Sequence, residues 1–91
     1  MLIRWLSASE RDLVRLHNVL EEVAPRAAAR NIQNIIAAVR RLPDYPRVGR
    51  IIEDYQPREV RALLVSDYEV HYEVFEDWLI VLRVWHAHED R

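Results

Sequence analysis

The residues of this chain that could do chemistry are its arginines, histidines and carboxylates, because it contains neither cysteine nor lysine. All 13 basic residues are arginines. An arginine stays protonated in proteins, so chemistry that needs a lysine base or nucleophile is excluded. The lack of cysteine likewise excludes a disulfide framework and a thiolate site. General acid–base work would fall to histidine and to aspartate or glutamate.

Arg83 is the most distinctive of these residues, because it is the only charge in an otherwise apolar run near the end of the chain. A charge in such a position is costly to bury unless it is paired. We expect Arg83 to be a functional site. The alternative is a structural arginine that pairs with a carboxylate such as Glu59 or Glu73.

Two histidines follow that run. His86 and His88 are two residues apart, so on a strand they would share one face. Together with Glu89 they could bind a metal ion. Two histidines without a further firm ligand are more typical of a solvated strand end, and we therefore expect no metal and no other cofactor.

Three runs of β-branched and aromatic residues in the region 59–88 would position these side chains. The breaks between the runs are only two residues long, Ser66 with Asp67 and Glu76 with Asp77. Such breaks predict tight hairpins and hence an antiparallel meander. In the second run tyrosine and valine alternate with glutamate and histidine from residue 68 to 74, which predicts one buried and one wet face.

The third run is apolar on both faces. The residues on one face would be Trp78, Ile80, Leu82 and Val84, and those on the other would be Leu79, Val81 and Trp85. A strand of this kind needs cover on both sides. If helices cover one face of the sheet, the other set is left for a loop, a second copy of the chain or a partner protein.

The first half of the chain predicts a short strand followed by two helices. Residues 1–6 alternate loosely and could form the strand. Ser7 and Glu10 have the spacing of a capping box for a helix over about 8–23. Pro25 suits the first turn of a second amphipathic helix that runs to about residue 42. Gly49 is the only glycine, and we expect its backbone to need a conformation that other residues resist.

The predicted order is strand, helical hairpin and three-stranded antiparallel meander, which is an α+β fold in one domain over 1–91. Hydrophobic residues make up 51% and charged residues 31% of the chain, as in globular proteins. No apolar run approaches the length of a membrane span. We therefore expect a cytoplasmic protein. The net charge of −2 gives no overall field that would attract nucleic acid.

Several motifs follow one another along nearly the whole chain. They read W-x-x-x-A/S-x-x-D-L, then P-x-x-A, then L-P-x-x-P-x-x-G-R, and finally R-E-x-R, Y-x-V-x-Y-x-V and D-x-L-I-V-L-R-V-x-H. Their residues are Trp5, Asp12, Leu13, Pro25, Leu42, Pro43, Pro46, Gly49, Arg50, Arg58, Glu59, Tyr68, Tyr72, Asp77, Arg83, Val84 and His86. In joint spacing they resemble the RelE/ParE superfamily of toxins from type II toxin–antitoxin systems, and the ParE-like branch most.

The resemblance implies a β-α-α-β-β-β fold and a toxin that an antitoxin from the adjacent gene holds inactive. ParE-like members poison DNA gyrase by binding, whereas RelE-like and YoeB-like members cut mRNA in the ribosome. If this chain is such a nuclease, His86, Arg83 and Glu53 would be its catalytic residues. However, the YoeB-like branch has a basic residue where this chain has Glu69, so we favour gyrase poisoning without catalysis. A third alternative is a non-toxic relic that binds only its antitoxin.

The residues and the resemblance together suggest candidate contact surfaces. For the target they are Arg50, Arg58, Arg61, Arg83, His86 and His88. For the antitoxin they are the apolar side chains Leu79, Val81 and Trp85 of the third run. The assembly could be a homodimer or a hetero-oligomer of toxin and antitoxin, and no membrane partner is implied.

Overall fold

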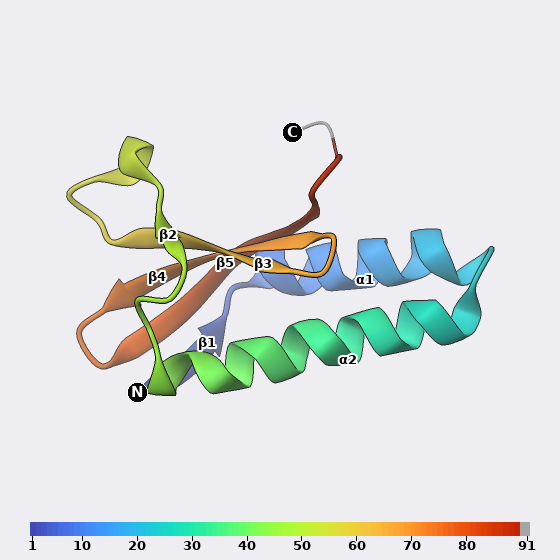
Figure 1. Cartoon of the computed structure of the whole chain (residues 1–91), viewed down its shortest axis with the longest axis horizontal. Coiled ribbons are helices and arrows are strands. Elements are labelled where there is room, and N and C mark those ends of the chain that lie inside the picture. Colours follow the sequence, from blue (N-terminus) through green and yellow to red (C-terminus); the bar gives the residue numbers. More distant parts are fainter. Residues whose placement is uncertain (90–91) are drawn as a thin grey trace.

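The computed structural model describes residues 1–89 and consists of one sheet with two helices packed on one face (Figure 1). The elements are β1 (Leu2–Trp5), α1 (Ser7–Glu21), α2 (Pro25–Arg41), η1 (Leu42–Asp44), β2 (Arg50–Ile51), η2 (Glu53–Tyr55), β3 (Val60–Val65), β4 (Tyr68–Phe75) and β5 (Trp78–His86). The strand order is β1-β5-β4-β3-β2. The predicted α+β fold with a helical hairpin and a meander is confirmed.

Two features of the sheet were not predicted. β1 pairs with β5 in parallel, so the first and the last strand are neighbours. β2 is a two-residue strand that pairs with β3 through Arg50 and Ile51. A strand of this length is too short to show an alternating pattern in the sequence.

The two predicted hairpin turns are present. Ser66 and Glu76 begin them with positive φ angles of 55° and 53°. Two-residue hairpin turns need a positive φ at this position because it matches the twist of the strands. The meander therefore turns at the two predicted positions, although neither turn contains glycine.

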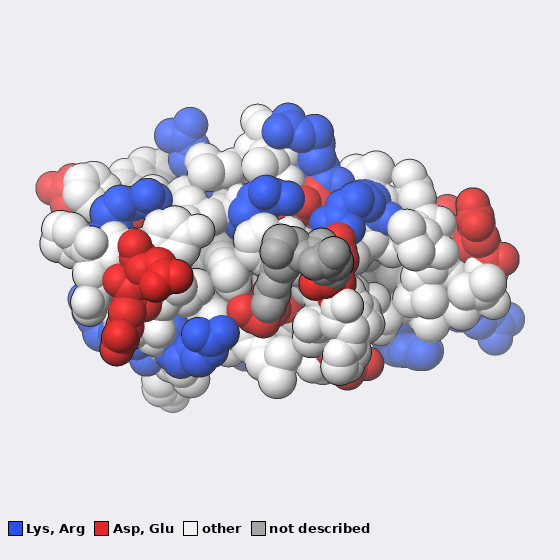
Figure 2. Space-filling model, turned by 90° about the horizontal axis from the view of Figure 1, so that it is seen from above, with Lys and Arg blue, Asp and Glu red and all other residues white. Residues whose placement is uncertain are grey.

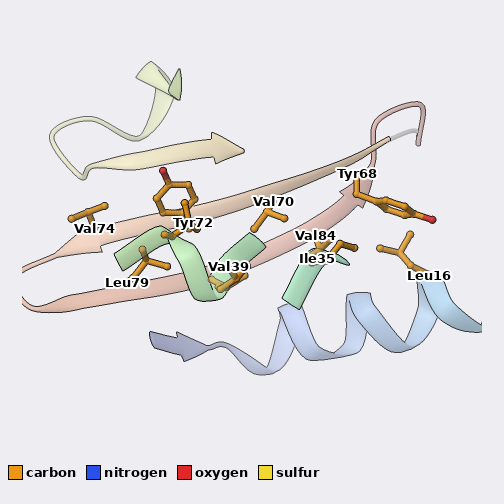
Figure 3. Close-up of a cluster of buried hydrophobic side chains, with 11 residues drawn as sticks. Leu16, Ile35, Val39, Tyr68, Val70, Tyr72, Val74, Leu79 and Val84 are labelled. Atoms are coloured by element: carbon orange, nitrogen blue, oxygen red, sulfur yellow. The ribbon is translucent and has the colours of Figure 1, made fainter. Parts of the chain in front are cut away.

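The core lies between the helices and the sheet face that they cover, which we call the covered face. The helices contribute Leu16, Ile35 and Val39 to it (Figure 3). The strands contribute Tyr68, Val70, Tyr72, Val74, Leu79, Val81 and Val84. The alternation in β4 is confirmed, because its tyrosines and valines are buried while Glu69, His71 and Glu73 lie on the opposite, open face.

A β-bulge changes the facing of β5. Tyr72 pairs with Val81 and His71 pairs with Arg83, so Leu82 is the extra residue between them. Beyond a bulge the alternation of side chains is shifted by one. Val84 is therefore buried on the covered face, which corrects the grouping of Val84 with Trp78.

Two of the predicted antitoxin-contact residues have to be corrected. Leu79 and Val81 are fully buried beneath the helical hairpin, so the chain itself covers them. They are not available at the surface to an antitoxin. Trp85, by contrast, pairs with Glu69 across the open face and stays partly exposed.

The start of α1 differs from the capping-box prediction. The N-cap residue is Leu6, Ser7 is already helical, and no side chain caps the first turn. Instead, the Ser9 hydroxyl donates to the Leu6 carbonyl at 2.6 Å. Leu6 is held by its own N–H, which donates to Val81 of β5, so sheet pairing fixes where the helix begins.

Gly49 is required for space. It does not have a positive φ, which corrects the expected reason for glycine here. A Cβ at this position would lie 2.8 Å from both the Ala62 carbonyl oxygen and the Tyr72 hydroxyl. The Gly49 N–H donates to the Tyr72 hydroxyl, which in turn donates to the Pro46 carbonyl. Close approach of the loop to β3 and β4 thus selects glycine.

Candidate functional site

Arg83 is paired with Asp12 of α1. Its Nε lies 2.7 Å from Oδ2 and its Nη2 lies 3.0 Å from Oδ1 of the carboxylate. The Val84 N–H also donates to Oδ2, at 2.9 Å. Arg83 therefore pairs with a carboxylate, as the structural alternative expects, but the partner is neither Glu59 nor Glu73, since α1 brings Asp12 to β5.

The position of Asp12 explains this arrangement. β1 pairs with β5 only as far as Val81, so the backbone of β5 would be unpaired beyond that residue. Asp12 takes the N–H of Val84 at this edge and is itself only 3% exposed. A buried carboxylate is tolerated when such donors surround it.

Asp12 and Arg83 each stabilise the charged form of the other. Burial alone would raise the pKa of the Asp12 carboxyl, but hydrogen bonds from Arg83, Val84 and Arg15 outweigh it and hold that pKa below its usual value. The hydrogen bond to Asp12 raises the pKa of Arg83. Arg15 also contacts the Glu89 carboxylate, so one ionic network joins α1, β5 and the C-terminal segment.

The outward part of Arg83 belongs to the open face. Its guanidinium carbon lies 4.8 Å from the centre of the Trp85 ring, which is a cation–π contact. Trp85 also meets the His71 ring edge-on, with 4.7 Å between the ring centres. His71 Nε2 is 2.7 Å from Glu69 Oε1. This cluster crosses β4 and β5, and the sequence prediction did not identify it.

Arg50 and Arg58 are exposed at the opposite side of the same face. The Nη2 of Arg50 lies 3.3 Å from Glu69 of β4. Arg58 makes two hydrogen bonds to Glu73, which raise the pKa of Arg58. Both arginine side chains remain more than half exposed, so they can contact a partner.

Arg61 has a structural role. Its Nη1 donates to the Gly49 and Arg47 carbonyls, and its Nε donates to Glu59 at 2.8 Å. Burial alone would raise the pKa of Glu59, but the hydrogen bonds from Arg61 and Arg47 lower it. Arg61 thus ties the loop before β2 to β3 and is mostly buried.

His86 and His88 lie away from these arginines, in a groove of about 640 Å³ between α1 and the end of the meander. The His86 ring packs edge-on against Tyr68, at 5.4 Å between the ring centres. The His88 N–H donates to Nδ1 of His86. The groove is also lined by the apolar side chains of Leu16, Val19, Leu20 and Val23, from α1 and its end, and by the polar residues Arg15, Asn31, Ser66, Asp67 and Glu89.

Comparison with known proteins places this chain in a family. The family described as "ParE toxin of type II toxin-antitoxin system, parDE" matches residues 3–91. The chain belongs to the ParE toxin family. It is therefore a toxin of the type II toxin–antitoxin class, as its motifs predicted.

Relatives and a solved structure agree with this membership. The Y4kP protein of Sinorhizobium fredii, which is named as a toxin, is 34% identical over 89 residues, covering 96% of this chain and 88% of that protein. Toxin RelE3 of Caulobacter vibrioides is 31% identical over 87 residues, covering 91% and 90%. The structure described as "Chromosomal ParDE TA system from P. aeruginosa" has a TM-score of 0.81 at 20% identity and covers 97% of both chains, which shows the same fold.

In this ParE family member the three residues predicted for a nuclease are not assembled. Arg83 is bound to Asp12, and His86 lies on the covered face beside Tyr68. Glu53 is exposed in η2, which follows the edge strand β2, with β3 and β4 between β2 and β5. His71 and Glu69 form another acid–base pair, but their side chains are only 13% and 12% exposed.

Within residues 1–89 no three histidine, aspartate or glutamate side chains are grouped so that they could hold a metal ion. No helix in this part of the ParE family chain is long and apolar enough to cross a membrane.

Sequence reasoning placed Asp12 in a motif but assigned it no role in the site. A signal existed, because Ser9, Asp12 and Leu16 are spaced as one face of a helix and all three are buried. An acid in such a stripe predicts a buried cationic partner. Arg83, the lone charge in an apolar strand, is the matching partner.

Proposed function

We propose that this ParE family toxin acts by binding DNA gyrase and trapping it on cleaved DNA, and that an antitoxin encoded by the adjacent gene neutralises it. Membership of the ParE family supports the gyrase target. Under this proposal no residue of the toxin performs chemistry, and the toxin works as a rigid binding surface.

The observation that carries the proposal is the engagement of Arg83 and His86 in the fold itself. Cleavage of RNA needs a base, an acid and a cation that converge on one phosphate. Here Asp12 holds Arg83 in two hydrogen bonds, and the ring of His86 packs against Tyr68 on the covered face. Both contacts favour a structural role for these residues over a catalytic one.

The open face is the proposed target-binding surface. Arg50, Arg58 and Arg83 belong to it, and the register runs directly across it from Arg50 through Ala62 and His71 to Arg83. Figure 2 shows that arginines and acids are interspersed on this side of the molecule. Mixed charges suit a protein surface with matching opposite charges better than the uniformly negative backbone of nucleic acid.

The groove beside α1 is the proposed antitoxin-binding surface. Val19 and Val23 are large apolar side chains that line the groove and are 69% and 81% exposed. An apolar patch of this kind is typical of a site that a partner covers. The groove thus replaces Leu79 and Val81 as the apolar contact surface, and His86 and His88 form its rim.

The decisive experiment compares the two targets directly. Purified toxin is added to DNA gyrase with supercoiled plasmid, and separately to translating ribosomes with a defined mRNA. We expect linear, gyrase-linked plasmid and intact mRNA. Coexpression with the adjacent gene should abolish the plasmid damage.

Surface variants refine this test. Arg50→Ala combined with Arg58→Ala should weaken gyrase inhibition about tenfold or more, because both exposed cations leave the proposed surface. Arg26→Ala is the matched control, since it removes an exposed arginine at the start of α2, on the helical side of the fold. Cleaved mRNA in the ribosomal A site with undamaged plasmid would overturn the proposal. Inactivity in both assays together with tight antitoxin binding would indicate the relic.

A further inference from the structure

The side of α2 that points away from the sheet carries arginines and no acid. Successive residues of a helix are about 100° apart around its axis, so positions 26, 30, 40 and 41 fall within about a third of the circumference. The buried residues Ala28, Ile35 and Val39 lie on the opposite side. No acid occurs anywhere in α2. The exposed arginines, which we call the basic stripe, are Arg26, Arg30, Arg40 and Arg41.

The arginines of the basic stripe are not neutralised by the fold. Within residues 1–89 no ion pair includes any of them. The open face differs, because Arg50 pairs with Glu69, Arg58 pairs with Glu73, and Arg83 pairs with an acid of α1. The net charge of −2 is thus an average over two unlike sides of the molecule. The helical side keeps a local positive charge that a partner can use.

The helix dipole explains only one end of the basic stripe. Cations are stabilised near the C-terminus of a helix, and Arg40 and Arg41 lie in the last turn of α2. Arg26 lies in the first turn, where the positive end of the dipole disfavours a cation and no acid compensates for it. Stability of the fold therefore does not account for Arg26. A partner that needs positive charge along the whole helix does.

The side chains between the arginines indicate the class of partner. Gln33, Asn34 and Ala37 lie between them, and none of the exposed residues of α2 is aromatic or large and apolar. Protein interfaces depend on such anchors. A helix on a membrane surface needs apolar side chains beside its cations, and single-stranded nucleic acid is bound by stacking on aromatic rings. The backbone of a nucleic-acid duplex needs only cations and polar donors.

The spacing of the basic stripe fits duplex DNA. At a rise of about 1.5 Å per residue, the midpoint of Arg26 and Arg30 lies about 19 Å from the midpoint of Arg40 and Arg41. The major groove of B-DNA is about 12 Å wide, with a phosphate backbone on either side, so each pair of arginines can reach one strand. The major groove of duplex RNA is narrow, which makes RNA a poorer match.

We propose that the basic stripe binds the phosphate backbone of duplex DNA, with Arg26 and Arg30 on one strand and Arg40 and Arg41 on the other, across the major groove. Contacts of this kind neutralise phosphates and carry no sequence information. The binding goes beyond the proposed function, because it needs neither gyrase nor an antitoxin. In Figure 1 α2 runs beneath the sheet along nearly the whole length of the molecule, so its outer side is well placed for an extended partner.

The test uses the full chain and a fluorescently labelled DNA duplex of about 20 base pairs. Its anisotropy is measured as purified toxin is added, at salt concentrations from about 25 to 200 mM. Four phosphate contacts predict that the logarithm of the binding constant falls with the logarithm of the salt concentration with a slope of about −3.6. No binding at the lowest salt, or a slope flatter than about −1, would overturn the proposal.

Paired substitutions test whether the basic stripe is the site. Arg30→Ala combined with Arg40→Ala should flatten the slope to about −1.8 and weaken binding at least about fivefold at low salt. Arg30→Lys combined with Arg40→Lys should keep most of the slope, because lysine also neutralises a phosphate. Arg50→Ala combined with Arg58→Ala is the matched control, since it removes the same charge from the open face and should leave the slope unchanged.

Competition identifies the partner. Unlabelled duplex DNA should displace the labelled duplex more readily than duplex RNA, single-stranded DNA, polyglutamate or vesicles that contain phosphatidylserine. Better competition by any of these, or equal flattening of the slope by the two pairs of alanine substitutions, would refute binding of duplex DNA by the basic stripe. The assay contains no gyrase, so its outcome is independent of the proposed target.

Discussion

At the scale of single residues, the molecule depends on polar groups that complete what the backbone leaves unpaired. Asp12 accepts the N–H at the edge of β5, and Tyr72 bridges Gly49 to Pro46. An isolated buried acid or hydroxyl would destabilise the fold, but each of these has its partners. Such residues are sensitive points for substitution.

Asp12→Asn should lower the free energy of unfolding by about 2–3 kcal/mol at neutral pH, because an amide places N–H donors against the donors of Arg83 and Val84. The pKa of Asp12 is lower in the folded chain than its usual 3.8. The stabilisation is therefore complete above about pH 4 and is lost as the pH falls through the folded pKa. Urea denaturation from pH 7 to pH 3 should show the wild-type and variant stabilities converge. A constant gap would contradict this role.

Gly49→Ala should cost about 1–3 kcal/mol, because the new Cβ would overlap the Ala62 carbonyl oxygen and the Tyr72 hydroxyl. Adding Tyr72→Phe removes the hydroxyl but leaves the backbone oxygen in place. The double variant should therefore recover only part of the loss beyond the cost of Tyr72→Phe alone. A double-mutant cycle in urea measures this coupling, and strict additivity would argue against the steric explanation.

At the scale of elements, the strands differ in how far their sequence determines them. The alternation of β4 predicts its faces, because one face is buried and the other is polar. β5 carries apolar residues on both sides of Leu82, so the sequence has no sign of the bulge that moves Val84 to the core. The sequence also did not determine which strand β1 pairs with, since a strand of four residues can pair with either edge of a meander.

The candidate site was predictable to a similar extent. The motifs identified Arg50, Arg58 and Arg83, and the structure places all three on the open face. They could not show that Asp12 holds Arg83, because the two residues meet only when α1 packs on β5. Long-range contacts of this kind depend on tertiary packing, which periodicity does not encode.

The β4–β5 turn offers a test at this scale. Glu76 has a φ of 53°, which is unfavourable for a residue with a Cβ. Glu76→Gly should raise the free energy of unfolding by about 0.5–1 kcal/mol. Asp77→Gly, one residue further along, should lower it, since Asp77 has no positive φ to relieve. Thermal unfolding of both variants checks this, and equal losses would contradict it.

At the scale of the whole molecule, two surfaces lie on different sides of one small sheet. Arg50, Arg58 and Arg83 belong to the open face, whereas the groove lies between α1 and the end of the meander. A partner in the groove and a target on the open face would therefore compete only if the partner reached around the sheet or altered the ionic network that joins Glu89, Arg15 and Asp12 to Arg83.

Val19→Asp should weaken binding of the proposed antitoxin about 10- to 100-fold, because it places a charge among the apolar side chains that line the groove. Val14→Asp is the matched control, since Val14 is similarly exposed on the same helix but does not line the groove. Calorimetric titration of each variant measures the affinities. Equal weakening by both substitutions would place the antitoxin elsewhere.

The pairing of β1 with β5 determines when, during synthesis, the arginine surface can form. During synthesis β1 and Asp12 leave the ribosome long before β5, and until then neither has its neighbour. Loop-closure entropy makes contacts between such distant parts of a chain slow to form. Asp12 can hold Arg83 only once β5 has been made, so a nascent or prematurely terminated chain would not display the arginine surface of the finished protein.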